Sequence, residues 1–175
     1  MRRSILAAFL LAFTFTLYLS SCDPQPKPNP TPDHTHDGGY GMHKKLWNQE
    51  DYDGVKAAIE DYVEGLYQVD STRIERSVDT TLRKLGYWYN PKDSTYRDNL
   101  YMSYKSLVSL AARWNKDGSQ VDENSPKKIE IYDVNSKTAS AKLTAAWGID
   151  YFHLGKVNGQ WKIFNVIWQS MPEEE

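Results

Sequence analysis

The fold is decided by one stretch near the C-terminus, DYFHLGKVNGQWKIFNVIW, which covers residues 150–168. Apolar and polar side chains alternate on both sides of Asn158-Gly159, and this dipeptide is a strong signal for a two-residue β-hairpin. Large apolar side chains fall on both faces of the predicted hairpin. We therefore expect both faces to be covered, one by helices and the other by a partner subunit.

The two-residue turn also predicts which residues pair across the hairpin. Leu154 is expected opposite Ile163, and Asp150 opposite Ile167. One face then carries Asp150, Phe152, Leu154, Trp161, Ile163, Asn165 and Ile167, and the other carries Tyr151, His153, Lys162, Phe164, Val166 and Trp168.

The strand that enters this hairpin is predicted to be very long, from residue 138 to residue 154. Gly148 lies in its middle, where a glycine commonly marks a bulge. A bulge would turn the later side chains over and place Asp150 on the same face as Leu143; without it, Tyr151 would continue that face. We favour the bulge.

Three helices are predicted before these strands. Asn48 can cap a first helix with the apolar stripe Tyr52, Val55, Ile59, Tyr62, Val63 and Leu66. Asp70 can cap a second helix that ends near Gly86, followed by a short strand at residues 87–89, and the third helix covers about 103–115. With a further strand at 128–134, the order of elements predicts an α+β fold in which a bent antiparallel sheet wraps the helices as a cone.

The N-terminus has the layout of a secretory signal, with Arg2 and Arg3 before an apolar run at 5–18 that is short for a membrane span. The sequence Leu19-Ser20-Ser21-Cys22 resembles a bacterial lipoprotein signal, in which the cysteine is lipidated. Cys22 is the single cysteine, so lipidation would leave no thiol for other chemistry. The alternatives are an ordinary signal peptide with a chance thiol, or a short membrane anchor.

These features predict three segments: a signal peptide at 1–21, a lipidated cysteine with a Pro- and Gly-rich tether at 22–45, and one domain at 46–172. The predicted location is the bacterial cell envelope, either periplasmic or at the cell surface, with the lipid membrane as a partner.

Charge and motifs exclude several classes of function. The formal net charge is −2, and removal of residues 1–21 makes it more negative, so nothing favours nucleic acid. Phosphate-binding loops, zinc motifs and cysteine clusters are missing from the sequence, and we predict no cofactor and no metal.

The order of elements also resembles the putative lumazine-binding family of the nuclear transport factor 2-like superfamily, together with SnoaL-like and ketosteroid isomerase-like proteins. The segments that carry this resemblance are 59–65, Asp70, Arg76, Met102-Ser103 and, best of all, the hairpin at 150–168. The resemblance implies a cone-shaped α+β domain, frequently dimeric, with a pocket between sheet and helices. The superfamily includes isomerases, cyclases and many proteins without known activity. The family name implies a pterin-like ligand.

Asp150 is the inward-facing carboxylate and a candidate base, since burial would raise its pKa. His153 is the rival candidate because its ordinary pKa suits proton transfer. Asn165 with Tyr62 or Tyr151 could hydrogen-bond a developing oxyanion.

For Asp150 and His153, a purely structural role is the favoured interpretation. Trp88, Trp147 and Trp161 could stack on a flat ligand, although large aromatic rings also build cores. The predicted function is binding of a small, flat, largely apolar ligand, with no catalysis assumed. The alternatives are a cofactor-independent isomerase, cyclase or dehydratase, and a non-catalytic dimeric interaction module.

Overall fold

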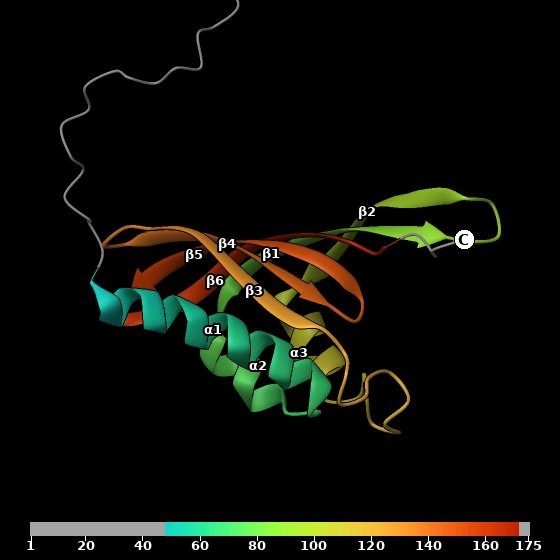
Figure 1. Cartoon of the computed structure of the whole chain (residues 1–175), viewed down its shortest axis with the longest axis horizontal. Helices are drawn as coiled ribbons and strands as arrows, with labels where there is room; N and C mark the ends of the chain where they lie inside the picture. Colours follow the sequence, from blue (N-terminus) through green and yellow to red (C-terminus); the bar gives the residue numbers. More distant parts are fainter. Residues whose placement is uncertain (1–47, 172–175) are drawn as a thin grey trace, which may run out of the picture. The chain divides into compact units, whose positions relative to one another are not determined.

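Three helices cover one face of a six-stranded sheet in the computed structural model, which describes residues 48–171 (Figure 1). The predicted signal peptide, Cys22 and the tether lie outside the described residues. The elements are α1 (Gln49–Tyr67), α2 (Ser71–Ser77), β1 (Val78–Asn90), β2 (Thr95–Ser103), α3 (Tyr104–Ala111), β3 (Lys127–Val134), β4 (Thr138–Ala145), β5 (Gly148–Val157) and β6 (Gln160–Gln169). The predicted α+β class, with helices packed on a curved sheet, is confirmed. No helix within residues 48–171 has both the length and the apolar character needed to cross a membrane.

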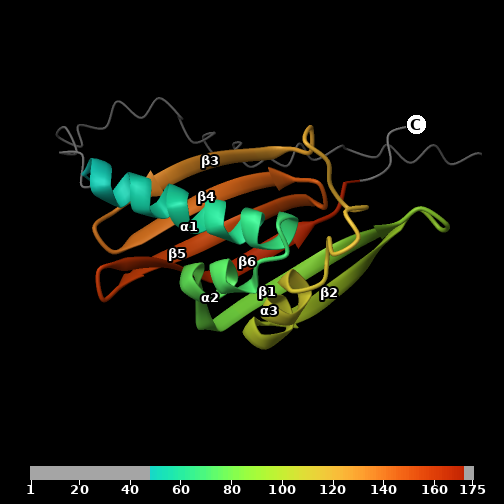
Figure 2. The same ribbon diagram turned by 90° about the horizontal axis from the view of Figure 1, so that it is seen from below.

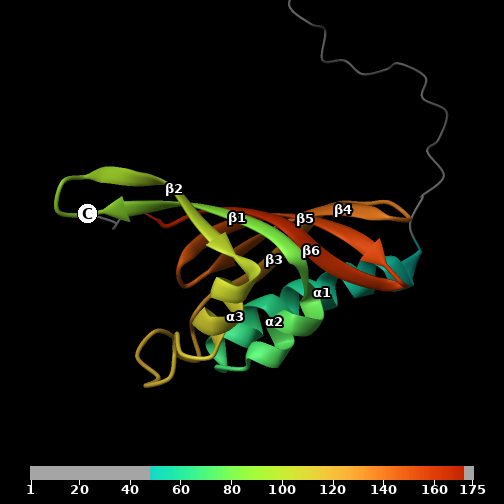
Figure 3. The ribbon, with the colours of Figure 1, turned by 180° about the vertical axis from the view of Figure 1, so that it is seen from behind.

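The strands lie in the order β2-β1-β6-β5-β4-β3, which Figure 2 shows from the helical side. Neighbouring strands are antiparallel except β1 and β6, which are parallel. This one parallel pairing brings the first described strand beside the last. Seen from behind, β1 and β2 continue as a two-stranded ribbon beyond the helices (Figure 3).

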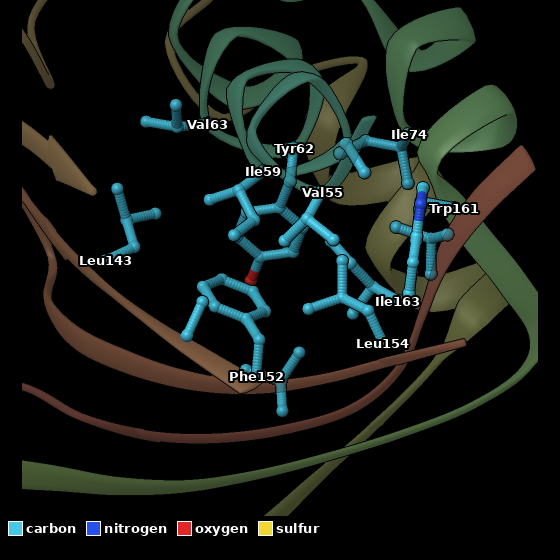
Figure 4. Close-up of a cluster of buried hydrophobic side chains, with 14 of the residues drawn as sticks. Val55, Ile59, Tyr62, Val63, Ile74, Leu143, Phe152, Leu154, Trp161 and Ile163 are labelled. Carbon is cyan, nitrogen blue, oxygen red and sulfur yellow. The ribbon is translucent and has the colours of Figure 1, made fainter. Parts of the chain in front are cut away.

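The α1 helix supplies one side of the core. Asn48 caps it as predicted, because its side chain accepts a hydrogen bond from the Asp51 backbone at 2.8 Å. Its apolar stripe packs on residues of β5 and β6, and the Tyr62 hydroxyl points toward the sheet (Figure 4). Gly54 is unfavourable in a helix by about 1 kcal/mol relative to alanine, but an added Cβ would lie 2.6 Å from the Trp161 ring. The glycine is therefore needed for the close packing of that ring.

The second helix is shorter than predicted. Asp70 caps α2, but the helix ends at Ser77, and residues predicted as helix up to Gly86 form β1. That prediction was wrong because the spacing of Val78 and Leu82 also fits a strand, and pairing with β2 and β6 on both sides outweighs local propensity. Strand β2 was not predicted.

The predicted long strand at 138–154 is two strands, β4 and β5, joined by a turn at Ala146-Trp147. Gly148 has φ +128°, a conformation that glycine adopts readily, and the chain reverses there instead of bulging. The single-strand prediction was therefore wrong. Its conclusion that Asp150 faces the core with Leu143 is confirmed, because the two residues pair and are both fully buried.

Strands β5 and β6 pair as predicted near their turn, with Leu154 opposite Ile163. Beyond that pair the register shifts, because β6 carries one extra residue, Phe164. Asp150 consequently lies opposite Trp168, and the predicted register was wrong from this point onward.

The extra residue Phe164 forms a bulge in β6, and the side chains after it point to the opposite faces from those predicted. Val166 is fully buried beneath the helices, and Trp168 packs against the core from the same side. Ile167 lies on the outer face, 44% exposed, and Asn165 lies beside it. The predicted inward positions of Asn165 and Ile167 were wrong because an inserted residue turns over everything after it.

Candidate functional site

A cavity of about 230 Å³ lies between the helices and the sheet. Its walls come from both layers and consist of Leu66, Lys84, Met102, Leu107, Leu110, Trp114, Trp147 and Trp168. Among these described lining residues, Lys84 alone is charged. An apolar, aromatic-rich cavity with one placed polar group is typical of small-molecule sites.

Lys84, on β1, belongs to a buried polar cluster beside this cavity. Its ammonium donates to Oδ1 of Asp150 at 3.0 Å and to the Tyr62 hydroxyl at 2.5 Å. The side chains of Lys84 and Asp150 are 6% and 0% exposed. Trp147 Nε1 donates to Oδ2 of Asp150 at 2.7 Å, so both carboxylate oxygens already have protein partners.

Burial sets the electrostatics of this cluster. It lowers the pKa of the Lys84 amine, while the Asp150 carboxylate acts in the opposite direction. Burial also raises the pKa of the Tyr62 hydroxyl well above its usual value, and the nearby Asp150 carboxylate adds to that rise. Tyr62 is therefore protonated at ordinary pH and serves as a neutral hydrogen-bonding group.

Aromatic rings hold one wall of the cavity in place. Trp114 and Trp147 meet edge to face at 5.3 Å between ring centroids, and Tyr67 stacks on Trp114 at 6.0 Å. The Tyr67 hydroxyl accepts a hydrogen bond from the Ala146 backbone at 2.8 Å and donates one to the Pro126 carbonyl at 2.7 Å. The β4–β5 turn that presents Trp147 is thus tied to α1.

Of the residues predicted for the site, Trp147 lines this cavity, and Tyr62 and Asp150 lie beside it in the polar cluster with Lys84. His153 and Asn165 instead lie on the outer sheet face, with His153 Nδ1 3.2 Å from Asn165 Oδ1. Tyr151 is on the same outer face and is 50% exposed.

The other two predicted tryptophans lie elsewhere. Trp88 is 44% exposed on β1, where that strand pairs with Arg97 of β2. Trp161 is buried against α1, and its Nε1 donates to Oδ1 of Asp51 at 3.2 Å. Neither residue lines the cavity.

Within residues 48–171, no three His, Cys, Asp or Glu side chains come together in a group that could hold a metal ion.

The family model described as putative lumazine-binding matches residues 50–169. The chain belongs to this putative lumazine-binding family. No curated protein matches the chain.

Solved structures similar to this family member share its nuclear transport factor 2-like fold. A protein of unknown function from Methylobacillus flagellatus is 18% identical in sequence and has a TM-score of 0.54. The match covers 73% of this chain and 98% of the Methylobacillus chain. One from Silicibacter pomeroyi is 16% identical with a TM-score of 0.53, covering 70% and 97%. One from Shewanella baltica is 22% identical with a TM-score of 0.50, covering 71% and 96%. At these identities the likeness shows the fold alone.

In this member of the putative lumazine-binding family, sequence reasoning missed Lys84 and Trp168. Lys84 was assigned to a helix, and Trp168 to the outer face. A signal for a strand was present around Lys84, because Thr80-Thr81 and the aromatic run at 87–89 are residue types that favour strands. Nothing in the sequence marks the insertion at Phe164 that turns Trp168 inward.

Proposed function

We propose that the domain binds a small, flat, largely apolar molecule in the cavity between helices and sheet. The observation that carries this proposal is the lining of the cavity, in which three tryptophans and four aliphatic or thioether side chains surround one lysine. An apolar cavity of about 150 Å³ is enough to hold benzene, so the volume of about 230 Å³ suits one or two fused rings.

Binding is better supported than catalysis by the geometry of the candidate bases. A carboxylate acting as a base needs a free oxygen facing the substrate. Asp150 has Lys84 on one oxygen and Trp147 on the other. His153 lies on the outer face, where its Nδ1 meets Asn165.

The test is binding of naphthalene to the full-length protein, measured by equilibrium dialysis, before and after the cavity is filled. Leu110 lines the cavity, and Leu110→Trp would place an indole in that space. Leu100→Trp, at a position that is 41% exposed, is the matched control. We expect the Leu110 variant to weaken binding at least about tenfold and the control to bind normally. No binding by the native protein, or equal binding by both variants, would contradict the proposal. Lumazine, dialysed in parallel, tests the ligand that the family name suggests.

A second candidate function is that of a dimeric interaction module, and the outer face of the sheet favours it. Tyr132, Tyr151 and Ile167 are each about half exposed on β3, β5 and β6. Tyr151 and Ile167 lie directly opposite each other in the sheet. We propose that a second copy of the chain covers this face, because adjacent large apolar groups on a sheet surface are typical of an interface.

We also propose that the domain is held at the bacterial envelope by lipid on Cys22. The support is the sequence Leu19-Ser20-Ser21-Cys22 after an apolar segment. Incorporation of a labelled fatty acid should be lost in Cys22→Ser, and retained label would contradict the proposal.

A further inference from the structure

Lys84 has a hydrogen-bond donor to spare at the cavity. A lysine ammonium carries three protons. One is donated to Asp150 and one to Tyr62, and within residues 48–171 the structure gives Lys84 no third acceptor. Because Lys84 also lines the cavity, the remaining proton is available to an acceptor atom on a bound molecule.

The charge of the cluster selects the kind of acceptor. The Lys84 ammonium and the Asp150 carboxylate form a buried pair with no net charge, and Tyr62 is neutral. A ligand carboxylate would add an uncompensated negative charge to an apolar cavity, where isolated charges are costly. A neutral carbonyl oxygen accepts the same proton without that cost.

The neighbouring rings also limit where the acceptor can lie. Lys84 Nζ is 5.2 Å from the centroid of Tyr62 and 5.4 Å from that of Trp168. Tyr62 meets the ammonium through its hydroxyl, at the edge of its ring, and the Trp168 ring lies beside the ammonium within cation–π distance. An acceptor on the edge of the ligand that faces Lys84 leaves the ring system of the ligand against the apolar lining.

We propose that the ligand of this cavity is a flat, uncharged ring compound with a carbonyl oxygen that accepts a hydrogen bond from Lys84. This inference rests on the proposed binding function and narrows its ligand class. Lys84 is then the residue that determines ligand polarity and orientation.

The test compares indane with 1-indanone, which have nearly equal shape, and indane-1-carboxylate with its neutral isostere indane-1-carboxamide, all on the full-length protein. Affinities are measured for the native protein and for the double variant Lys84→Met/Asp150→Asn, which removes both charges together. We expect the affinity for 1-indanone, relative to indane, to fall at least about fivefold in the double variant. The carboxylate should bind the native protein more weakly than the carboxamide, which has the same shape and no charge. Lys128→Met, a lysine whose side chain is 71% exposed and lies outside the cavity, is the matched control.

A second measurement needs no variant. The carbonyl stretch of 1-indanone bound to the native protein should move to lower frequency than in hexane, because a hydrogen bond from the ammonium polarises the carbonyl and weakens its C=O double bond. An unchanged stretch, an unchanged affinity ratio, or preferred binding of the carboxylate would overturn the carbonyl inference while leaving apolar binding intact. Failure of indane itself to bind would overturn the proposed function instead.

Discussion

Among single residues, Lys84 and Asp150 are the ones whose separate replacement we expect to destabilise the fold strongly. Both side chains are almost fully removed from water and are joined at 3.0 Å. Desolvation of such a pair offsets much of its attraction, so the pair adds little net stability. Removing one partner is different, because it leaves a buried charge without compensation.

We expect Lys84→Met and Asp150→Asn each to lower the free energy of unfolding by about 3 kcal/mol. The double variant should lose less unfolding free energy than the two single variants together, because neither charge is left buried without its partner. Urea unfolding, followed by tryptophan fluorescence, measures the free energy of unfolding of all four proteins in this double-mutant cycle. Strict additivity would contradict the interpretation of the pair. The exposed pair Lys56–Glu60 is the control, and its removal should change stability by less than about 1 kcal/mol.

Asp51 leads to a prediction about pH. The hydrogen bond from Lys156 holds the pKa of its carboxyl below the ordinary value, and a second bond from Trp161 acts in the same direction. A carboxyl whose pKa is lower in the folded chain stabilises the fold above its unfolded pKa of about 3.9. This stabilisation is lost as pH falls through the folded pKa.

Asp51→Asn should therefore lower the melting temperature at pH 7, and the difference from the native protein should shrink as the pH falls below about 4. Thermal unfolding across this range measures the effect. Asp98→Asn, at an exposed position, should show no such convergence. A difference that stays constant with pH would rule out the role assigned to Asp51.

At the scale of elements, the contact between β1 and β6 determines one wall of the cavity. A Cβ added at Gly86 would lie 2.1 Å from Nε1 of Trp168. Glycine at this point therefore allows the indole to lie flat across β1. The Trp168 nitrogen is itself buried without a hydrogen-bond partner among the described residues.

Gly86→Ala should displace the Trp168 ring, destabilise the fold by about 1–3 kcal/mol and weaken naphthalene binding. Denaturant unfolding and equilibrium dialysis measure the two effects. Gly155→Ala is a strand control with a milder contact, 3.0 Å to the Phe164 ring, and it should cost less and leave binding unchanged. Equal effects of both substitutions would mean that Gly86 has no special role in the cavity.

The elements also show what can be predicted from local sequence. The caps at Asn48 and Asp70 and the turn at Asn158-Gly159 depend on neighbouring residues only, and all three were predicted correctly. Strand β1 depends on partners far away in the chain. The turn at Ala146-Trp147 lacks the residues that usually favour turns, and only the geometry of Gly148 marks it.

At the scale of the whole molecule, the outer face of the sheet determines the oligomeric state that we expect. Ile167→Lys would place a charge in the middle of the proposed interface between two copies. We expect the variant to elute as a monomer in size-exclusion chromatography and the native protein as a dimer. Val157→Lys, 40% exposed at the tip of the β5–β6 hairpin, is the control and should remain dimeric. A native monomer, or a dimer that survives the Ile167 substitution, would contradict the proposal.

The candidate site could be predicted only in part, because some of its residues depend on pairing between strands that are far apart in the chain. Tyr62 was identified because the apolar stripe of α1 shows its inward face. Asp150 was placed inward by way of a bulge at Gly148, where the structure has a turn, and Trp147 lies in that turn. Lys84 and Trp168 come from strands whose orientation depends on the β1–β6 pairing and on one inserted residue. The cavity is a property of the assembled sheet, and no single segment of the chain encodes it.

The parallel pairing of β1 with β6 has a consequence for the order of events during protein synthesis. Lys84 lies beside Val166, so β1 leaves the ribosome on the order of ten seconds before its partner strand. During this interval the nascent chain has neither a closed sheet nor the Trp168 wall. The pocket therefore cannot close before β6 has been made, and a chain stalled before β6 would expose its apolar interior to chaperones and proteases.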